Sequence, residues 1–327
     1  MKSPYDVVIA GAGAGGGFAA MVLAQRGFKV LLLDRGKRYD FSKDFPMNFP
    51  DWERQPRAFS SRADTFARAR GADIQREDAD ICSGVYRNGV LKQSAPNRRG
   101  PFRYQRAMGL GGSTLHYQGE AHRYPEHAFM PRSRYGWGQD WPLNYERLAP
   151  WYEKVEQLLG GAGIANNPYK VARGDYPTPA HALSTSSQLA QRGAEKLGWS
   201  LLQNSLALPS RSVDGRTPCQ HSGGCVQGCR FGAKSSVDLT AIRRAEETGN
   251  LTILTHCRLL NVETADRGVV SGLLVKIDKS VQRIQARVYI LALGAIETPR
   301  ILLASQDSFH PAGIGNHNDQ VGRNIME

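Results

Sequence analysis

The first residues whose spacing suggests chemistry form a glycine-rich run near the start of the chain. Residues 11–16 read GAGAGG and fit the pattern GxGxxG through Gly11, Gly13 and Gly16, and Asp34 follows at the end of the next apolar run. The first glycine permits a tight turn, the second lets backbone approach a pyrophosphate, and the third allows a helix to pack closely on a strand. An acid at this spacing can accept hydrogen bonds from a ribose. The pattern predicts a dinucleotide site, with a glycine-rich turn of no function as the alternative.

Three of the five cysteines lie in one short segment with the spacing C-x5-C-x3-C, namely Cys219, Cys225 and Cys229. An odd total with three thiols crowded together does not suit a disulfide framework and is typical of a metal or cluster site. Three thiolates suit a three-iron, four-sulfur cluster, and the surrounding glycines let a short loop fold around it. The alternatives are a zinc site with His221 as fourth ligand, or three unligated thiols. Cys82 and Cys257 are isolated, and we expect core thiols there.

The glycine motif needs a strand before it and a helix after it, and the sequence supplies both. Residues 5–10 are β-rich, residues 18–26 favour a helix that Gly27 can end, and residues 29–33 form a second buried strand. Together they predict a β-α-β unit with a parallel sheet. A β-rich return to this sheet is predicted from the strand-like runs 251–255, 258–263, 269–277 and 288–293.

Two helices can be placed further along the chain. Asn144 can cap a helix that Gly160 ends, and Ser235 or Ser236 can cap a second helix running to about residue 247. In the first of these helices the following residues share one face and are predicted to pack in the core: Leu148, Trp151, Tyr152, Val155, Leu158 and Leu159.

Two other segments distinguish a flavin site from a nicotinamide site. Residues 106–118 (RAMGLGGSTLHYQ) form a second glycine-rich loop, suited to close approach of backbone to a flat ring, with an ordinary turn as the alternative. Residues 289–295 (YILALGA) form an apolar strand that ends in Ala-x-Gly. At these residues, and at 140–148 and 320–325, the chain resembles the glucose-methanol-choline (GMC) flavoprotein oxidoreductases.

The resemblance assigns the cofactor FAD and the residues that hold it. It implies that the ADP half is bound by Gly11, Gly13, Gly16 and Asp34. The pyrophosphate and isoalloxazine are expected to contact Gly111, Gly112, Ser113 and Thr114. The backbone of Leu259 is expected to contact the adenine, and Gly294 is a further expected contact of the cofactor. In some relatives a histidine placed like His116 is joined covalently to the flavin. A histidine that hydrogen-bonds the flavin or packs beside it is the interpretation we favour.

The cysteine spacing resembles that of GMC dehydrogenases whose flavin subunit carries an iron–sulfur cluster. The resemblance implies oxidation of CH–OH groups of an alcohol or sugar, with hydride passing to flavin N5 and electrons passing through the cluster to a cytochrome or quinone. It also implies a cytochrome c subunit and a small export or assembly subunit as partners. A non-catalytic FAD-binding fragment, or half of a split enzyme that needs a second chain, is the alternative.

The expected architecture is α/β, with a Rossmann-like FAD-binding domain interrupted by an inserted substrate and cluster region. The expected parts are residues 1–119 and 235–327 for FAD binding, with residues 120–234 forming the insertion. Family members continue beyond residues 320–325 into a part that supplies the catalytic histidine, so the catalytic residues stay unassigned and His310 is not proposed as the base. We therefore expect a fragment, a split half or a truncated product with little turnover of its own.

Composition limits the remaining classes. With 327 residues, 41% of them hydrophobic, the chain can form two packed units. The net charge of +12 is spread among acidic residues and accompanies no nucleic-acid motif, so no nucleic-acid partner is expected. The uncharged stretch at residues 7–25 contains five glycines, and neither a signal peptide nor a membrane span is predicted. The expected location is cytoplasmic by default, or the periplasmic membrane face through a partner subunit.

Overall fold

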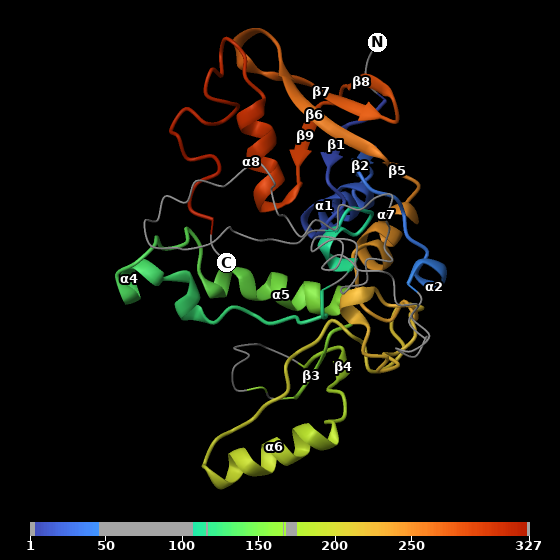
Figure 1. Ribbon diagram of the computed structural model, residues 1–327, viewed down its shortest axis with the longest axis vertical. Coiled ribbons are helices and arrows are strands. Elements are labelled where there is room, and N and C mark those ends of the chain that lie inside the picture. Colours follow the sequence, from blue (N-terminus) through green and yellow to red (C-terminus); the bar gives the residue numbers. More distant parts are fainter. Residues whose placement is uncertain (1–3, 46–106, 116, 166, 168–174, 326–327) are drawn as a thin grey trace, which may run out of the picture. The chain divides into compact units, whose positions relative to one another are not determined.

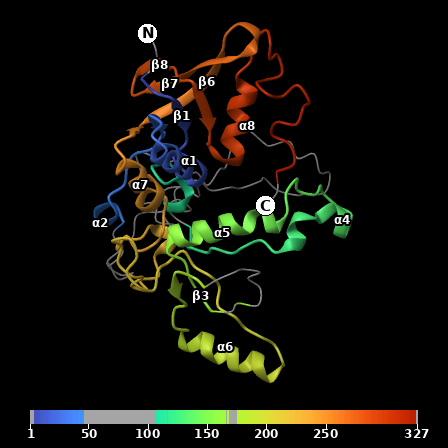
Figure 2. The ribbon, with the colours of Figure 1, turned by 180° about the vertical axis from the view of Figure 1, so that it is seen from behind.

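The computed structural model describes residues 4–45, 107–115, 117–165, 167 and 175–325. The chain divides into two compact units. Unit 1 contains residues 1–116, 226–228 and 236–327, and unit 2 contains residues 117–225 and 229–235. Figures 1 and 2 show the elements from opposite sides. The fold is mixed α/β with a parallel sheet, as the sequence predicted.

Unit 1 is built on a four-stranded parallel sheet in the order β5-β2-β1-β9. Val7 of β1 pairs with Val30 of β2 on one side and with Val288 of β9 on the other. Every residue of β1 and β2 is buried, as expected for a parallel sheet that is covered on both faces. The strand bounds are β1 Val7–Ala10, β2 Val30–Leu33, β5 Leu251–Leu254 and β9 Val288–Leu291.

The helix α1 (Ala14–Gln25) follows β1 directly and contacts both β1 and β2. It begins earlier than the sequence predicted, and Gly27 follows it with a positive φ of 85°. It also contacts the π-helix η4 (Asp238–Ile242) and the short helix α7 (Arg243–Glu246). This packing fixes the start of α1 directly beyond the end of β1, which is where the glycine motif lies.

A second sheet of unit 1 is antiparallel and has the order β6-β7-β8. Its strands are β6 (Cys257–Thr264), β7 (Val270–Ile277) and β8 (Ser280–Ile284), visible in orange in Figure 1. Buried side chains of β6 and β7 share one core with alternate residues of β1 and β2 and with Ile301 of α8 (Gly294–Ala304). The predicted return of all four runs to the parallel sheet was wrong for β6 and β7. The prediction missed β8 because nearly all of its residues are exposed, and Val281 and Ile284 alone form neither an apolar run nor an alternating pattern.

The predicted helix after Asn144 is α5 (Tyr145–Leu159), the green helix in Figure 1. Asn144 caps it by accepting a hydrogen bond from the Arg147 N–H at 3.2 Å, and Gly160 ends it in the left-handed conformation. The predicted apolar core face is not fully buried, because Trp151 is 61% exposed. The buried residues of α5 are Tyr145 and Glu156.

The predicted serine cap of the helix near residue 237 was wrong. Neither serine caps η4 through its side chain: Ser235 Oγ instead donates to the Leu159 carbonyl at 2.5 Å, and the Ser236 carbonyl accepts from Thr240 Oγ1. The helix opens as a π-helix and becomes α-helical only at α7.

Unit 2 holds α5 and several shorter elements. In the described part of the chain these are η2 (Glu126–Phe129), α4 (Pro131–Tyr135), β3 (Ala162–Gly163), β4 (Thr178–Pro179), α6 (Thr185–Lys196) and η3 (Cys225–Gln227), whose last two residues are counted with unit 1. Among the helices described, none combines the length and apolar character that crossing a membrane requires.

Candidate functional site

The parallel sheet of unit 1 ends at a cavity of about 480 Å³. The cavity lies beyond the carboxyl ends of β1, β2 and β9, the place where open α/β sheets bind ligands. Predicted site residues line it from segments far apart in the sequence, namely Gly11, Gly13, Asp34, Gly112, Ser113, Leu259 and Gly294. Of the other residues predicted to bind FAD, Gly16 in the first turn of α1 and Gly111 and Thr114 near the second glycine loop do not line it. His116 lies outside the described residues.

The turn after β1 requires glycine at two positions. Gly11 has a φ of 100°, and a Cβ there would lie 2.4 Å from the Ala292 carbonyl oxygen, which follows β9. A Cβ on Gly16 would lie 1.8 Å from the Gly11 carbonyl oxygen, so α1 approaches the turn as closely as the motif predicts. Gly13 differs, because a Cβ there would meet only Gly112 Cα at 4.0 Å. Its missing side chain leaves room in the cavity and is not needed for packing of the chain.

Two helices begin at this cavity. Ala14, the first residue of α1, and Gly294, the first residue of α8, both line it. Unpaired N–H groups and the helix dipole make a helix N-terminus attractive to anions. The first turn of α1 contains no acidic residue, whereas Glu297 in the first turn of α8 pairs with Arg300 at 2.8 Å. The α1 end is therefore suited to a phosphate group.

Asp34 connects β2 to the glycine turn. Its Oδ2 accepts a hydrogen bond from the Ala12 N–H at 3.0 Å, and its Oδ1 accepts one from the Gly36 N–H at 2.8 Å. Burial raises the pKa of this carboxyl, and backbone N–H donors, including those of Ala12 and Gly36, act against that rise. Each carboxylate oxygen has a second lone pair, so the group can still accept from a ligand hydroxyl in the cavity.

The second glycine loop lies against the first. The Gly111 N–H donates to the Ala12 carbonyl at 2.9 Å, and a Cβ on Gly112 would lie 2.8 Å from Gly13 Cα. Thr114 links this loop to the start of the π-helix: Thr114 Oγ1 donates to the Gly111 carbonyl at 2.6 Å and accepts from the Val237 N–H at 3.0 Å. The two loops therefore form one backbone surface along the cavity.

Other lining residues were not predicted from the sequence. Arg35 and Arg258 bring positive charge to the cavity beside Asp34 and Leu259, and Glu297 and Arg300 line it from α8. Each is adjacent or close in sequence to a residue that was predicted, which is the only signal that could have identified it. Isolated arginines among scattered charges do not otherwise differ from surface residues.

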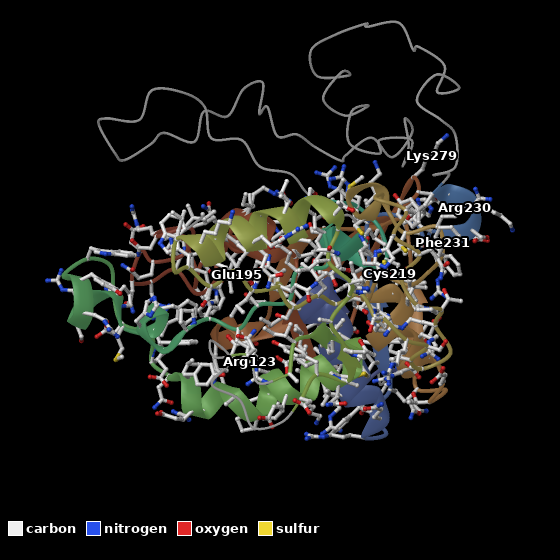
Figure 3. The ribbon with its side chains drawn as sticks, turned by 90° about the horizontal axis from the view of Figure 1, so that it is seen from below. Arg123, Glu195, Cys219, Arg230, Phe231 and Lys279 are labelled. Atoms are coloured by element: carbon white, nitrogen blue, oxygen red, sulfur yellow. The ribbon has the colours of Figure 1, made fainter. Side chains whose placement is uncertain are left out.

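The three clustered cysteines all belong to unit 2. Cys219, Cys225 and Cys229 are partly exposed, and Figure 3 labels Cys219 with Arg230 and Phe231 of the same loop region. Over the described ranges, no group of three or more His, Cys, Asp or Glu side chains is arranged to hold a metal ion. Cys257 is buried at 2% exposure, as expected of a core thiol, and Cys82 lies outside the described residues.

Two backbone N–H groups point to sulfur atoms of this loop. His221 N lies 3.5 Å from Cys219 Sγ, and Lys234 N lies 3.4 Å from Cys229 Sγ. Burial raises the pKa of the Cys225 thiol, the charge of Lys234 lowers it, and the thiols of Cys219 and Cys229 raise it. The thiols are thus near enough to influence one another, and N–H donors aimed at sulfur are a feature that tunes thiolate-held clusters.

The predicted zinc alternative required His221 as a fourth ligand. The His221 ring lies edge-on to the ring of His181, with ring centroids 5.0 Å apart, and Nε2 of His181 lies 2.7 Å from the Leu208 carbonyl oxygen. The zinc alternative stays a prediction.

Comparison with known proteins identifies the family to which the chain belongs. The family model for GMC oxidoreductases matches residues 14–327, so the chain belongs to the GMC oxidoreductase family. The fold is accordingly that of a Rossmann-like FAD-binding protein, as predicted.

Two curated relatives illustrate the range of the family. The chain is 29% identical to the fructose dehydrogenase large subunit of Gluconobacter japonicus, over 98% of this chain and 58% of that protein. It is 27% identical to the 6'''-hydroxyparomomycin C oxidase of Streptomyces lividus, over 98% of this chain and 54% of that protein. The chain thus spans little more than half the length of these relatives.

Solved structures share the fold at lower identity. Pyridoxine 4-oxidase from Mesorbium loti matches with a TM-score of 0.54 and 18% identity, over 92% of this chain and 52% of that chain. A formate oxidase matches with a TM-score of 0.55 and 18% identity, over 93% of this chain and 48% of that chain.

Proposed function

We propose that this chain is the FAD-binding part of an oxidoreductase that acts on CH–OH groups of an alcohol or sugar. The observation that carries the proposal is the cavity itself, where two glycine loops, a buried acid and the N-terminus of α1 converge at the ends of three parallel strands. Membership of the GMC family supplies the reaction class. Fructose dehydrogenase and 2-methyl-1,2-propanediol dehydrogenase, both similar in sequence, are named for substrates of this kind.

The residues of this cavity bind and orient the cofactor. When bound, FAD supplies the hydride acceptor that no amino-acid side chain can provide. The backbone of the first glycine turn and the α1 N-terminus hold the pyrophosphate, and Asp34 accepts hydrogen bonds from the ribose. Gly112 and Ser113 of the second loop would approach the pyrophosphate and the flavin ring. The backbone of Leu259, with Arg258 beside it, would contact the adenine.

We further propose that Cys219, Cys225 and Cys229 hold an iron–sulfur cluster of the three-iron, four-sulfur type. The thiol spacing and the two N–H groups aimed at sulfur support this assignment. Such a cluster supplies a one-electron relay between a flavin and an acceptor, for which a cytochrome c subunit or a quinone is the proposed partner.

Replacing Gly13 tests the FAD site. Because a Cβ at Gly13 meets no close neighbour, we expect Gly13→Ala to fold normally while crowding the pyrophosphate and reducing FAD content at least tenfold. The measurement is the ratio of flavin absorbance to protein after purification. Gly193→Ala in α6 is the control, because a Cβ there also meets nothing within 4 Å and the site lies in the other unit. Normal FAD content in Gly13→Ala would contradict the assignment.

Purification without oxygen tests the cluster. We expect iron and acid-labile sulfide in the wild-type chain, their loss in Cys225→Ser, and their retention in Cys257→Ser, which alters a buried thiol of the other unit. Zinc without sulfide would support the alternative metal site. Absence of all three elements from the wild type would contradict both.

A further inference from the structure

Arg258 lines the cavity of unit 1 from β6, and it is exposed. Its two neighbours along the strand, Cys257 and Leu259, are buried at 2% and 7% exposure in the core of unit 1. Because successive side chains of a strand point to opposite faces, the burial of these two directs the side chain of Arg258 away from the core. Arg258 therefore lies where the cavity meets solvent, and its backbone is held in place on both sides.

A second cation lies beside Arg258. Lys276 of β7 is its direct partner in the antiparallel register, so the two side chains share one face of the sheet. Like charges in this arrangement repel each other. Among the described residues, neither side chain has an ion-pair or hydrogen-bond partner. The fold thus gains no stability from the charge of Arg258, and of the two cations only Arg258 lines the cavity.

A nucleotide carries its phosphate, ribose and base in a fixed order, and the cavity offers a place for each. The α1 N-terminus suits the phosphate, and Asp34 suits the ribose. The start of β6 is attached to the backbone of Asp34, because the Cys257 N–H donates to the Asp34 carbonyl at 2.8 Å. Arg258, the next residue, is therefore placed to meet the base, one ribose away from the phosphate.

We propose that Arg258 recognises the adenine of the bound dinucleotide by laying its guanidinium plane on the face of the purine ring. This inference rests on the proposed FAD site. Adenine carries no net charge, so a simple point charge gains little from it. A guanidinium group is planar and weakly hydrated, and it stacks on aromatic faces with a cation–π contribution. The backbone of Leu259 would meet the edge of the same ring, so that adjacent residues of β6 contact its face and its edge.

Three variants separate the flat shape of the side chain from its charge. Arg258→Met keeps the length but loses both properties, Arg258→Lys keeps only the charge, and Arg258→Tyr keeps only a flat group. Each full-length protein, freed of bound flavin, is titrated with ADP by calorimetry and with FAD by flavin fluorescence. We expect the Kd for both ligands to rise about tenfold in Arg258→Met and Arg258→Lys, and Arg258→Tyr to stay within about threefold of the wild type, because bases stack on aromatic rings.

Lys276→Met is the matched control. It removes the same charge from the facing position of the same two strands, and Lys276 does not line the cavity. The Kd for ADP and FAD should stay unchanged when measured at physiological salt, where interactions between exposed charges are largely screened. The melting temperature of each ligand-free protein is measured as well, and it should not fall in any of the four variants, because both positions are exposed.

The outcomes are distinguishable. A wild-type chain that binds neither ADP nor FAD overturns the proposed cofactor site and this inference together. Binding that is unchanged in Arg258→Met overturns the role of Arg258 alone. Normal binding by Arg258→Lys with weak binding by Arg258→Tyr also overturns it, because charge, and not stacking, would then act on the ligand. Equal losses in Arg258→Met and Lys276→Met overturn it too, because they would show that only the net charge of this sheet face matters.

Discussion

The Ala12 N–H donates a hydrogen bond to Asp34 Oδ2 over 3.0 Å, so the acid at the end of β2 holds the glycine turn at the end of β1. Asp34 uses its other oxygen for the Gly36 N–H. The sequence motif assigns this acid to the ribose of a bound nucleotide. In this fold the same carboxylate also fixes the backbone that would face the pyrophosphate, so one side chain links the two parts of the site.

Asp34→Asn should therefore damage the site beyond the loss of a ribose contact. An amide offers one acceptor oxygen, whereas the Ala12 and Gly36 N–H groups each use a separate carboxylate oxygen. One buried N–H would face the amide NH₂ group, at a cost of about 1–3 kcal/mol. We expect a lower melting temperature and FAD content reduced at least tenfold, measured by thermal unfolding and flavin absorbance.

Asp6→Asn is the matched control for this prediction. Asp6 Oδ2 also accepts a backbone N–H, that of Lys29 at 3.0 Å, but Asp6 does not line the cavity. A single amide oxygen can replace that bond, so FAD content should stay normal. Equal FAD content in Asp34→Asn and Asp6→Asn would show that Asp34 has no special role.

Cys257 gives the fold a defined dependence on alkaline pH. Burial, and then the nearby charge of Asp34, raise the pKa of its thiol from 9.0 to about 11. Because the folded state retains the proton longer than the unfolded state, the stabilisation is fully present below pH 9.0 and is lost as the pH rises through about 11. Urea unfolding should therefore show the free energy of unfolding falling by about 2 kcal/mol between about pH 8 and 10.5 from this group.

Cys257→Ala should remove that part of the pH dependence. The variant leaves a small cavity and lowers the free energy of unfolding at every pH by on the order of 1 kcal/mol. Val275→Ala in the same core is the control: it also leaves a cavity but should keep the wild-type slope, because it removes no ionisable group. A wild-type slope in Cys257→Ala would mean that other groups produce the alkaline transition.

The sequence predicted the central unit of the fold because its signals are local. The turn at Gly11 depends on the conformation that glycine can adopt. Strand β2 depends on a short apolar stretch. Both signals are set by neighbouring residues in the sequence. The exposed strand β8 carries no such signal. The burial of Lys234 depends on the distant carbonyl of Tyr117, and the charge of Arg258 in the cavity depends on the path of β6. Contacts between segments so distant in sequence leave no periodic pattern to read.

The absence of a local signal for distant contacts also explains why the predicted core face of α5 was not fully buried. Its apolar spacing predicted a core face that includes Trp151, but the buried residues of the helix are Tyr145 and the charged residue Glu156. Glu156 Oε1 accepts from Arg123 Nε at 2.7 Å and Oε2 accepts from Arg123 Nη2 at 2.8 Å, with both side chains almost inaccessible to water. Arg123, labelled in Figure 3, also donates to the Tyr145 hydroxyl at 3.1 Å. A hydrophobicity pattern cannot show that a distant arginine neutralises a buried acid.

Glu156→Gln should consequently destabilise unit 2. Removing one partner of a buried ion pair leaves the other charge uncompensated, and such changes cost about 3–5 kcal/mol, with the retained amide oxygen favouring the lower end. The exposed pair Arg243–Glu247, at 2.6 Å, provides the control, since Glu247→Gln should cost less than about 1 kcal/mol. Urea unfolding followed by tryptophan fluorescence measures Glu156→Gln, because Trp151 lies on α5, and circular dichroism measures Glu247→Gln, which lies in unit 1. Equal stability of the two variants would mean that the Arg123–Glu156 pair contributes no more than a surface contact, and that packing of the tyrosines around it holds α5 in place.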